Sequence, residues 1–316
     1  MENCLYIVVP CYNEEAVLRE TTKRLTAKLT GMIEDGLIVP SSKVLYVNDG
    51  SQDRTWELIE EIHSQNPLIS GISLAHNQGH QNALLAGLLT AKDHADIVIS
   101  MDADLQDDIE LIDEMVRKYQ EGYDVVYAVR SARRTDSFFK RFSAESFYKL
   151  MSLMGAEIVY NHADYRLTSR RVLESLKEYQ EVNLFLRGLF PAIGYPSTTV
   201  EYERKERFAG ESKYPLKKMM AFAWEGITSF TIHPLRFISL LGVIVSVVSM
   251  IFLISFLINK FFGYTVAGWA SVICSIWLIG GLQMFCLGII GEYIGKIYYE
   301  TKRRPRFHIE RNLLEE

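Results

Sequence analysis

Acidic residues follow an apolar stretch near residue 100. Asp102, Asp104 and Asp107 come directly after Ile97–Met101, which is typical of a buried strand. Carboxylates at the exit of such a strand are poorly suited to a core, whereas their oxygens are the ligands that hard divalent cations prefer. We therefore expect Asp102 and Asp104 to hold Mg2+ or Mn2+ together with oxygens of a diphosphate. The alternative, a helix cap formed by Asp107 or Asp108, leaves the first two acids unexplained.

A second polar cluster follows the first apolar stretch, Leu5–Val9. Pro10 is expected to end this strand, because proline has no N–H for a sheet ladder. Asn13 or Glu14 can then cap the helix that follows. Tyr12 lies between them, and at the edge of a cleft its ring can stack on a nucleobase.

A third polar cluster follows the apolar stretch Val44–Val47. Gly50 allows a tight turn, and Asp49 can accept hydrogen bonds from a base or a ribose. Ser51 or Asp53 is expected to cap the next helix in either case. The cluster therefore offers one candidate binding residue, Asp49, beside ordinary turn chemistry.

A fourth cluster contains two histidines, His76 and His80, with Asn77 and Gly79 between them. Histidines four residues apart on a helix can bind zinc. Gly79 instead marks a junction between a loop and a helix, so a zinc site is not predicted here.

Strand-like and helix-like stretches alternate through the first 130 residues, which predicts an α/β fold with a mostly parallel sheet. All four clusters follow strand-like stretches, and ligands of parallel sheets bind beyond the carboxyl ends of the strands. The clusters should therefore meet in one cleft. The strand-like stretches are Leu5–Val9, Val44–Val47, Ile69–Leu74, Ile97–Met101 and Val125–Val129, and the helix-like ones are Glu15–Leu29, Thr55–His63, Gln81–Ala91 and Ile109–Tyr119.

Taken in order, the clusters form a series of motifs that is much more specific than any one of them. The series is Pro10-x-Tyr12-Asn13-Glu14-Glu15, Asn48-Asp49-Gly50-Ser51-x-Asp53, Asn77-x-Gly79, Asp102-Ala103-Asp104-Leu105-Gln106-Asp107, Arg207-x-x-Gly210-x-Ser212-Lys213-Tyr214 and Gly291-Glu292-Tyr293-Ile294-Gly295. It resembles the family 2 inverting glycosyltransferases, which have the Rossmann-like GT-A fold. Within that family it is most similar to the polyprenyl-phosphate glycosyltransferases, the group of the bactoprenol glucosyltransferases and dolichol-phosphate mannose synthases.

The resemblance implies a role for each matching residue. It implies Mg2+ or Mn2+ on Asp102, Asp104 and Gln106, and catalytic roles for Asp104, Asp164, Arg207 and Lys213. The acceptor phosphate would be bound by Arg207, Ser212 and Lys213. The nucleotide-sugar would be bound by Pro10, Tyr12, Asn13, Glu14, Asp49, Asn77, Gly79, Asp102 and Ala103.

Two positions depart from the family pattern. The family often has proline where this chain has Asp108, and a lysine is common where it has His80. Neither change touches the acidic run, but the second bears on the choice of sugar donor.

The implied acceptor, a polyprenyl phosphate, is a phosphate monoester whose second pKa is about 6, by analogy with phosphorylated side chains. The attacking oxygen is then already ionised at neutral pH. We therefore expect Asp164 mainly to orient a substrate, with proton removal secondary. Arg207 and Lys213 would draw the two anionic substrates together, helped by Arg187 or Arg204, and their alternative role is to anchor the chain at the membrane.

Two long uncharged stretches lie near the C-terminus, Phe237–Ile258 and Val266–Ile290. Each exceeds the roughly 20 residues that a helix needs to cross the hydrocarbon layer. Basic residues lie before the first and after the second, and such flanks stay in the cytoplasm. We expect two spans, at about 235–258 and 266–290, with both termini inside and an outer loop around Asn259–Thr265.

The expected order of parts follows from these boundaries. A cytoplasmic catalytic domain covers residues 1–214, an amphipathic juxtamembrane segment 215–233, the two-helix membrane domain 234–295 and a cytoplasmic basic tail 296–316. Glycines 288, 291 and 295 leave one face of the second span open, which allows contact with the first span or with a second copy of the chain.

The net charge of −5 argues against nucleic acid as a partner. A processive polysaccharide synthase is one alternative, but the Gln-x-x-Arg-Trp motif of such enzymes is missing and they usually have more spans. A non-catalytic membrane protein that binds nucleotide or lipid is the other, and the intact acidic run disfavours it. Two terminal spans fit the bacterial branch, which favours UDP-linked glucose or N-acetylglucosamine as the donor and undecaprenyl phosphate as the acceptor.

Overall fold

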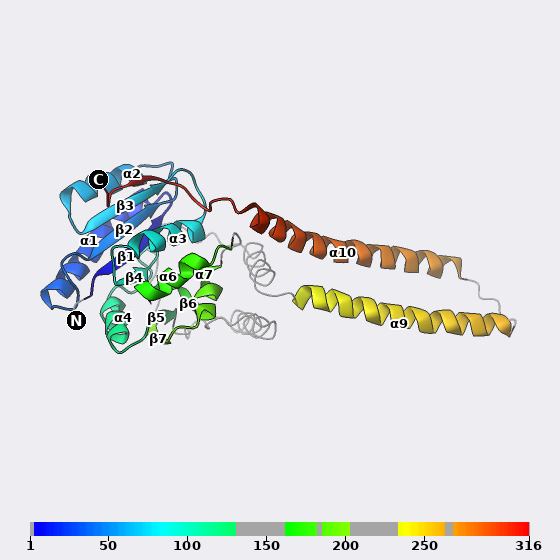
Figure 1. Ribbon diagram of the computed structural model, residues 1–316. Coiled ribbons are helices and arrows are strands. Elements are labelled where there is room, and N and C mark those ends of the chain that lie inside the picture. Colours follow the sequence, from blue (N-terminus) through cyan, green and yellow to red (C-terminus); the bar gives the residue numbers. More distant parts are fainter. Residues whose placement is uncertain (1–2, 131–161, 182–184, 203–232, 263–267, 316) are drawn as a thin grey trace. The chain divides into compact units, whose positions relative to one another are not determined.

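The computed structural model describes residues 3–130, 162–181, 185–202, 233–262 and 268–315 (Figure 1). The chain divides into two compact units. The first comprises Met1–Leu153, Glu157–Leu216 and Arg304–Glu316, and the second comprises Met154–Ala156 and Lys217–Arg303.

Eight strands in the described part of the first unit form one sheet, in the order β7-β5-β6-β4-β1-β2-β3-β8. All strands except β6 and β8 run in one direction, so the predicted mostly parallel α/β fold is confirmed. In chain order the strands are β1 (Leu5–Cys11), β2 (Lys43–Asn48), β3 (Ile69–Leu74), β4 (Ile97–Ser100), β5 (Val125–Arg130), β6 (His162–Ser169), β7 (Ser197–Tyr202) and β8 (Ile309–Asn312).

Helices connect the parallel strands as the alternating pattern predicts. Strands β1, β2 and β3 are buried along almost their whole length, which explains why they read as continuous apolar stretches rather than alternating ones. The helices of this unit are α1 (Glu15–Glu34), α2 (Thr55–Gln65), α3 (His80–Ala91), α4 (Leu111–Gln120), α6 (Arg170–Glu178) and α7 (Leu186–Ile193).

Strand β1 does not end at Pro10, so that prediction is wrong. The strand continues to Cys11, and Pro10 pairs in register with Val47 of β2. The carbonyl of Cys11 accepts the Asp49 amide on the β2 side, and that of Val8 accepts the Met101 amide on the β4 side. Backbone groups alternate sides along a strand, so Pro10 faces the β4 side just where β4 has ended. No ladder bond is lost there.

The C-terminal segment joins the sheet of the first unit. Strand β8 pairs antiparallel with β3, and Leu313 behind it is buried in the main core. Figure 1 shows this red segment beside β3. The expectation of a plain basic tail over 296–316 is therefore incomplete. Four residues, two of them charged, give little periodic signal, and their pairing partner lies more than 200 residues away in sequence.

The second unit contains two long helices, α9 (His233–Phe261) and α10 (Trp269–Lys302). Among the described residues, one stretch is long and apolar enough to cross a membrane, Leu278–Lys302, and a shorter apolar stretch covers Leu235–Val245. The two predicted spans coincide with helices, but the second crossing is not confirmed by this criterion.

The glycine-rich face of α10 remains open in the described structure. A Cβ atom added at position 288, 291 or 295 would meet no atom within 4 Å. The predicted contact of this face with the other span is not seen there, and contact with a second copy of the chain stays a prediction.

Helix α3 packs closely against the sheet at Gly87. A Cβ atom there would lie 2.4 Å from Val8 Cγ1 and 2.6 Å from Val47 Cγ2, both in the middle of the sheet. Replacing Gly87 by Ala should lower the free energy of unfolding by about 1–3 kcal/mol, because the packed strands cannot move aside. The measurement is the urea unfolding transition in detergent.

The matched control is Gly31→Ala in α1, where a Cβ atom would meet nothing within 4 Å. This change should raise the free energy of unfolding by about 0.5–1 kcal/mol, because alanine loses less backbone entropy in a helix. Equal effects of the two substitutions would contradict the packing argument.

Candidate active site

The loops after β1 and β2 are tied together by hydrogen bonds. The Asn13 amide donates to Ser51 Oγ at 3.0 Å, and the Gln52 amide donates to Asn13 Oδ1 at 2.8 Å. The Glu14 amide donates to Thr55 Oγ1 at 2.9 Å. Asn13 adopts a left-handed backbone conformation, with φ of 57°, which asparagine tolerates better than most residues. Its side chain thus joins two loops and does not cap α1.

The helix starts in these loops differ from the expected caps. Asp53 Oδ1 accepts the Thr55 amide at 3.0 Å, at the first residue of α2, but the residue at the N-cap position is Arg54, which makes no side-chain cap. Ser51 instead accepts the Asn13 amide, and Glu14 makes no side-chain cap on α1. Tyr12 remains 44% exposed, which leaves its ring accessible for stacking.

Asp49 fixes the loop His76–Gly79. Its Oδ1 accepts the Gln78 amide at 2.7 Å and its Oδ2 accepts the Gly79 amide at 3.0 Å. The side chain is buried, and burial raises its pKa even though the two amide bonds lower it. Both carboxylate oxygens therefore bind the loop backbone, and contact with a base or ribose would use their remaining lone pairs.

Gly50 lets this loop approach β2 closely. Its φ is +63°, and a Cβ atom there would lie 2.6 Å from the Asn77 nitrogen. The loop holding Asn77 and Gly79 is therefore seated directly on the turn after β2, as a shared binding cleft requires.

The acidic run forms a tight loop after β4, held by its third acid. Asp107 Oδ1 accepts the Tyr202 hydroxyl at 2.6 Å, and its Oδ2 accepts the Asp102 amide at 3.4 Å. The cap alternative is thus wrong for Asp107: α4 begins at Leu111, where the backbone carbonyl of Asp108 accepts the first amide. Asp107 is buried by its bond to β7, which no local sequence pattern indicates.

Asp102 and Asp104 are partly exposed, unlike Asp107. Asp104 Oδ1 accepts the Gln106 amide at 3.2 Å, and the Gln106 side chain is largely buried. Within the described residues, no three His, Cys, Asp or Glu side chains lie close enough to hold a metal ion. Asp102 and Asp104 still offer carboxylate oxygens, the ligands that hard divalent cations prefer.

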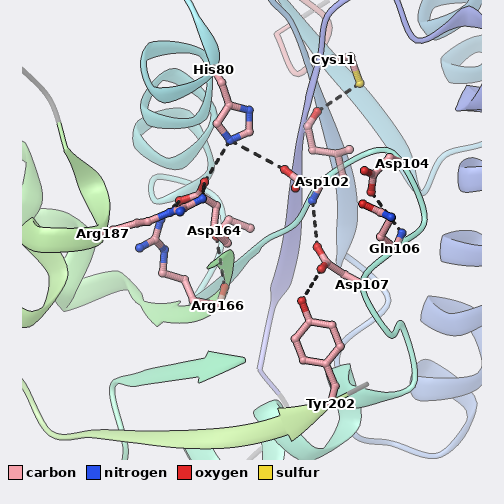
Figure 2. A network of polar contacts seen from close by, with 12 residues as sticks. Cys11, His80, Asp102, Asp104, Gln106, Asp107, Asp164, Arg166, Arg187 and Tyr202 are labelled. Atoms are coloured by element: carbon pink, nitrogen blue, oxygen red, sulfur yellow. Dashed lines mark hydrogen bonds and ion pairs between the residues drawn. The ribbon is translucent and has the colours of Figure 1, made fainter. Parts of the chain in front are cut away.

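Asp164 is the centre of a charged network in which four side chains meet (Figure 2). Arg187 Nη2 lies 2.9 Å from its Oδ2, and Arg166 Nη2 lies 3.2 Å from its Oδ1. His80 Nε2 lies 3.4 Å from Asp164 Oδ2 and 3.8 Å from Asp102 Oδ1. His80 therefore links the acidic loop after β4 to the carboxylate on β6.

The charges of this network fix the ionisation of its members. Burial alone raises the pKa of Asp164, but the contacts with His80, Arg187 and Arg166 hold it well below its ordinary value. Burial lowers the pKa of His80, and the carboxylates of Asp164 and Asp102 more than compensate, so the net shift is upward. Burial, with Asp164 and Asp104 nearby, raises the pKa of Asp102, a site where a cation would relieve the repulsion.

Arg166 is the buried cation of this network. It is fully buried on β6, with its guanidinium 4.1 Å from the centre of the Phe190 ring, and burial lowers its pKa to about 10. Its Nε and Nη1 have no hydrogen-bond partner in the described structure. Its one ion pair, with Asp164, is therefore the main compensation for a charge held out of water.

The structure thus brings together most of the predicted site residues. Strand ends and loops hold six of them at one edge of the sheet: Asp49, Asn77, Gly79, Asp102, Asp104 and Asp164. Pro10 near the end of β1 and Ala103 in the loop after β4 are buried beside them. The predicted acceptor residues Arg207, Ser212 and Lys213, and the juxtamembrane segment up to 232, lie outside the described residues.

Sequence reasoning missed the bridging role of His80 and the buried guanidinium of Arg166. The sequence singles out His80 only as one of two histidines weighed for zinc and as a departure from the family pattern. Arg166 stands two residues after Asp164, and in a strand that spacing places both side chains on one face. That was the available signal.

The fold and the site together define a glycosyltransferase. The family model described as glycosyl transferase family 2 matches residues 6–177, more than half of the chain. The chain belongs to this family, which confirms the predicted membership and the enzyme class.

Close relatives cover nearly the whole chain. The uncharacterized glycosyltransferase YkoT of Bacillus subtilis is 54% identical over 312 residues, which span 99% of this chain and 93% of that protein. A bactoprenol glucosyl transferase of Shigella phage SfX is 40% identical over 308 residues, 96% of this chain and 98% of that one. The prophage bactoprenol glucosyl transferase homolog of Escherichia coli is 39% identical, with coverage of 96% and 98%.

Among solved structures, the glucosyl-3-phosphoglycerate synthase of Mycobacterium tuberculosis was crystallised with Mn2+, UDP-glucose and phosphoglyceric acid. It matches 72% of this chain and 78% of its own, with 18% identity and a TM-score of 0.48.

The ionic role of Asp164 predicts a pH-dependent stability. A lowered native pKa stabilises the fold above the ordinary aspartate pKa of about 3.9, and this stabilisation is lost as the pH falls through the native value. Asp164→Asn should therefore lower the free energy of unfolding at pH 7 by about 3 kcal/mol. The difference from the parent protein should narrow below about pH 4, as measured by urea unfolding from pH 3 to 7.

Asp93→Asn is the control, because Asp93 also pairs with a cation, Lys92, but has a side chain 65% exposed to solvent. Its effect should stay below about 1 kcal/mol. A cost of Asp164→Asn that is the same at every pH would show that Asp164 is not held ionised.

Proposed function

We propose that this glycosyltransferase moves glucose from a nucleotide-sugar, UDP-glucose, to a polyprenyl phosphate at the cytoplasmic face of the membrane of a bacterial cell. The observation that carries the proposal is the network that links Asp102 to Asp164 through His80, with Arg187 on the far side. It joins a carboxylate suited to a cation with a guanidinium suited to an anion. Relatives named bactoprenol glucosyl transferase, about 40% identical over nearly their full length, support the choice of acceptor and sugar.

The nucleotide is proposed to bind across the loops after β1, β2 and β3. These loops are cross-linked by hydrogen bonds through Asn13 and Asp49, so the surface they form is fixed before a ligand arrives. The exposed ring of Tyr12 would stack on the base, and Asp49 would reach the base or ribose. Pre-organised contacts of this kind lower the entropic cost of binding.

Asp102 and Asp104 are the residues that would hold Mg2+ or Mn2+, with Gln106 behind them. The cation would supply charge stabilisation for the nucleoside diphosphate as it leaves. We propose either metal as the cofactor, with Gln106 as a further ligand.

Asp164 is proposed to orient and not to act as an obligatory base. A carboxylate with a strongly lowered pKa is a weak base, and its lone pairs face Arg187, Arg166 and His80. A phosphate acceptor needs little help from a general base, because it is largely ionised at neutral pH. Asp164 would therefore hold Arg187 toward the acceptor phosphate, with Arg207, Ser212 and Lys213 as further proposed contacts.

Two membrane crossings are proposed for α9 and α10. Helices of 29 and 34 residues are about 44 and 51 Å long at 1.5 Å per residue, and both exceed the hydrocarbon core. Chain connectivity supports an even number of crossings, because Arg304–Glu316 belong to the same compact unit as Met1–Leu153 and Glu157–Leu216. One crossing alone would place the two parts of that unit on opposite sides of the bilayer.

The transfer reaction is tested with membranes that contain the protein, radiolabelled UDP-sugars and undecaprenyl phosphate. Labelled glucose should enter the lipid extract, and chelation of divalent cations should stop the reaction. Asp102→Asn or Asp104→Asn should each lower kcat/KM by roughly 10²-fold or more, because charge stabilisation at the leaving group is lost. Glu110→Gln is the control, since this 77% exposed side chain pairs with Lys28 and should leave the rate unchanged.

The result also separates the rival functions. A processive synthase would extend a glycan without consuming the lipid phosphate, and a non-catalytic binding protein would release no nucleoside diphosphate. Label from another sugar nucleotide in the lipid, with none from UDP-glucose, would refute the choice of sugar but not the reaction class.

The two-span topology is tested by cysteine accessibility in intact cells. A cysteine at Phe262, after α9, should react with an impermeant maleimide added outside. A cysteine at Glu315 should react only after the cells are permeabilised. Labelling of both from outside, or of neither, would refute two crossings with an inner C-terminus.

A further inference from the structure

Strand β3 leads directly into the loop that Asp49 holds. Leu74 is the last residue of β3, Ala75 follows it, and the His76–Gly79 loop begins at the next residue. The Ala75 amide donates to the carbonyl of His308 at 3.0 Å. The base of this loop is therefore held by the segment that returns from α10.

The returning segment is docked firmly along β3. Its strand β8 pairs Asn312 with Ile72, and the Leu313 amide donates to the Gly71 carbonyl at 2.9 Å. Leu313 is only 6% exposed and lies in the main hydrophobic core. Without β8, strand β3 would be an exposed edge with unpaired backbone groups on the side that β8 now covers.

The same loop is held at its other end by Asp49. Its carboxylate accepts the amides of Gln78 and Gly79, and the next residue, His80, is the first of α3. His80 in turn contacts Asp102 and Asp164. The loop thus has two attachments, and one of them belongs to the C-terminal segment.

We propose that the C-terminal segment His308–Leu313 is a positioning element for the nucleotide-sugar site, acting through the His308 carbonyl on the loop after β3. The inference rests on the proposed function only in that this loop contacts the nucleotide. Docking of Leu313 keeps β8 in register, the register keeps His308 opposite Ala75, and this contact fixes the path of His76–Gly79. The segment that follows α10 therefore also completes the binding site.

The experiment compares the full-length protein with Leu313→Ala and the milder Leu313→Val. Hydrogen exchange of the amides from Ala75 to Gly79 should be at least tenfold faster in Leu313→Ala. The dissociation constant of UDP with Mn2+, measured by calorimetry, and the KM for UDP-glucose should rise about tenfold. The KM for undecaprenyl phosphate should change less than twofold. Leu313→Val should shift the same quantities in the same direction by about twofold.

Two controls separate this role from general destabilisation. Leu29→Ala makes a similar cavity in α1, because Leu29 is likewise a buried core leucine, and should leave UDP binding unchanged. Arg19→Ala removes an exposed ion pair with Glu61 outside the C-terminal segment and should also leave it unchanged. Unchanged exchange of the β1 amides in each variant would verify that the rest of the sheet remains folded.

Several outcomes would overturn the proposal. Faster loop exchange with unchanged UDP affinity would show that the loop does not need this support. Unchanged exchange at Ala75 in both Leu313 variants would show that docking and the loop are not coupled, and equal loss of affinity in Leu29→Ala would indicate a merely structural effect. Failure of the parent protein to bind any nucleotide would instead refute the proposed function.

Discussion

The buried carboxylate of Asp164 is the interaction on which the rest of the site depends. A charge removed from water is costly unless it is paired, and here the partners come from the same strand and from two further elements. Arg166 lies on the same strand, Arg187 near the start of α7, and His80 at the start of α3. Since His80 also contacts Asp102, the carboxylate fixes the acidic loop after β4 relative to β6. One charge thus determines the relative positions of four segments.

Much of the fold was accessible from local sequence patterns, because strands β1 to β5 are apolar runs, whereas β7, Ser197–Tyr202, is largely polar and gave no such signal. The edge of the sheet where Asp49 and Asp102 lie follows from those apolar runs alone. Strands β6 and β8 could not be placed in this way. Their positions depend on pairing with residues far away in sequence, β6 with β4 and β8 with β3. The local pattern identifies a strand, but only tertiary contacts decide its neighbours.

In the acidic run, residue type alone does not predict which aspartates face solvent. Asp102, Asp104 and Asp107 are chemically alike, and spacing does not tell which of them face solvent. The structure separates them by their surroundings: Tyr202 and a backbone amide bury Asp107, whereas Asp102 and Asp104 stay partly exposed. Asp107 therefore shapes the loop that presents the other two. Asn13 is a similar case, since an asparagine in a binding motif also has the backbone flexibility that a loop junction needs.

Charge balance decides what else the site requires. The carboxylates of Asp102, Asp104 and Asp164 face the guanidinium groups of Arg166 and Arg187 and the imidazole of His80, whose pKa is raised, so the described cluster has no surplus positive charge for an anion. A bound divalent cation would add only a small positive surplus, while a diphosphate and a phosphate monoester would have to be brought together. The proposed function therefore needs further cations at the acceptor, and the basic residues before α9 are the ones proposed for it. Because a polyprenyl phosphate is confined to the bilayer, those cations are useful only beside the membrane. The proposed function therefore places the catalytic domain at the membrane surface.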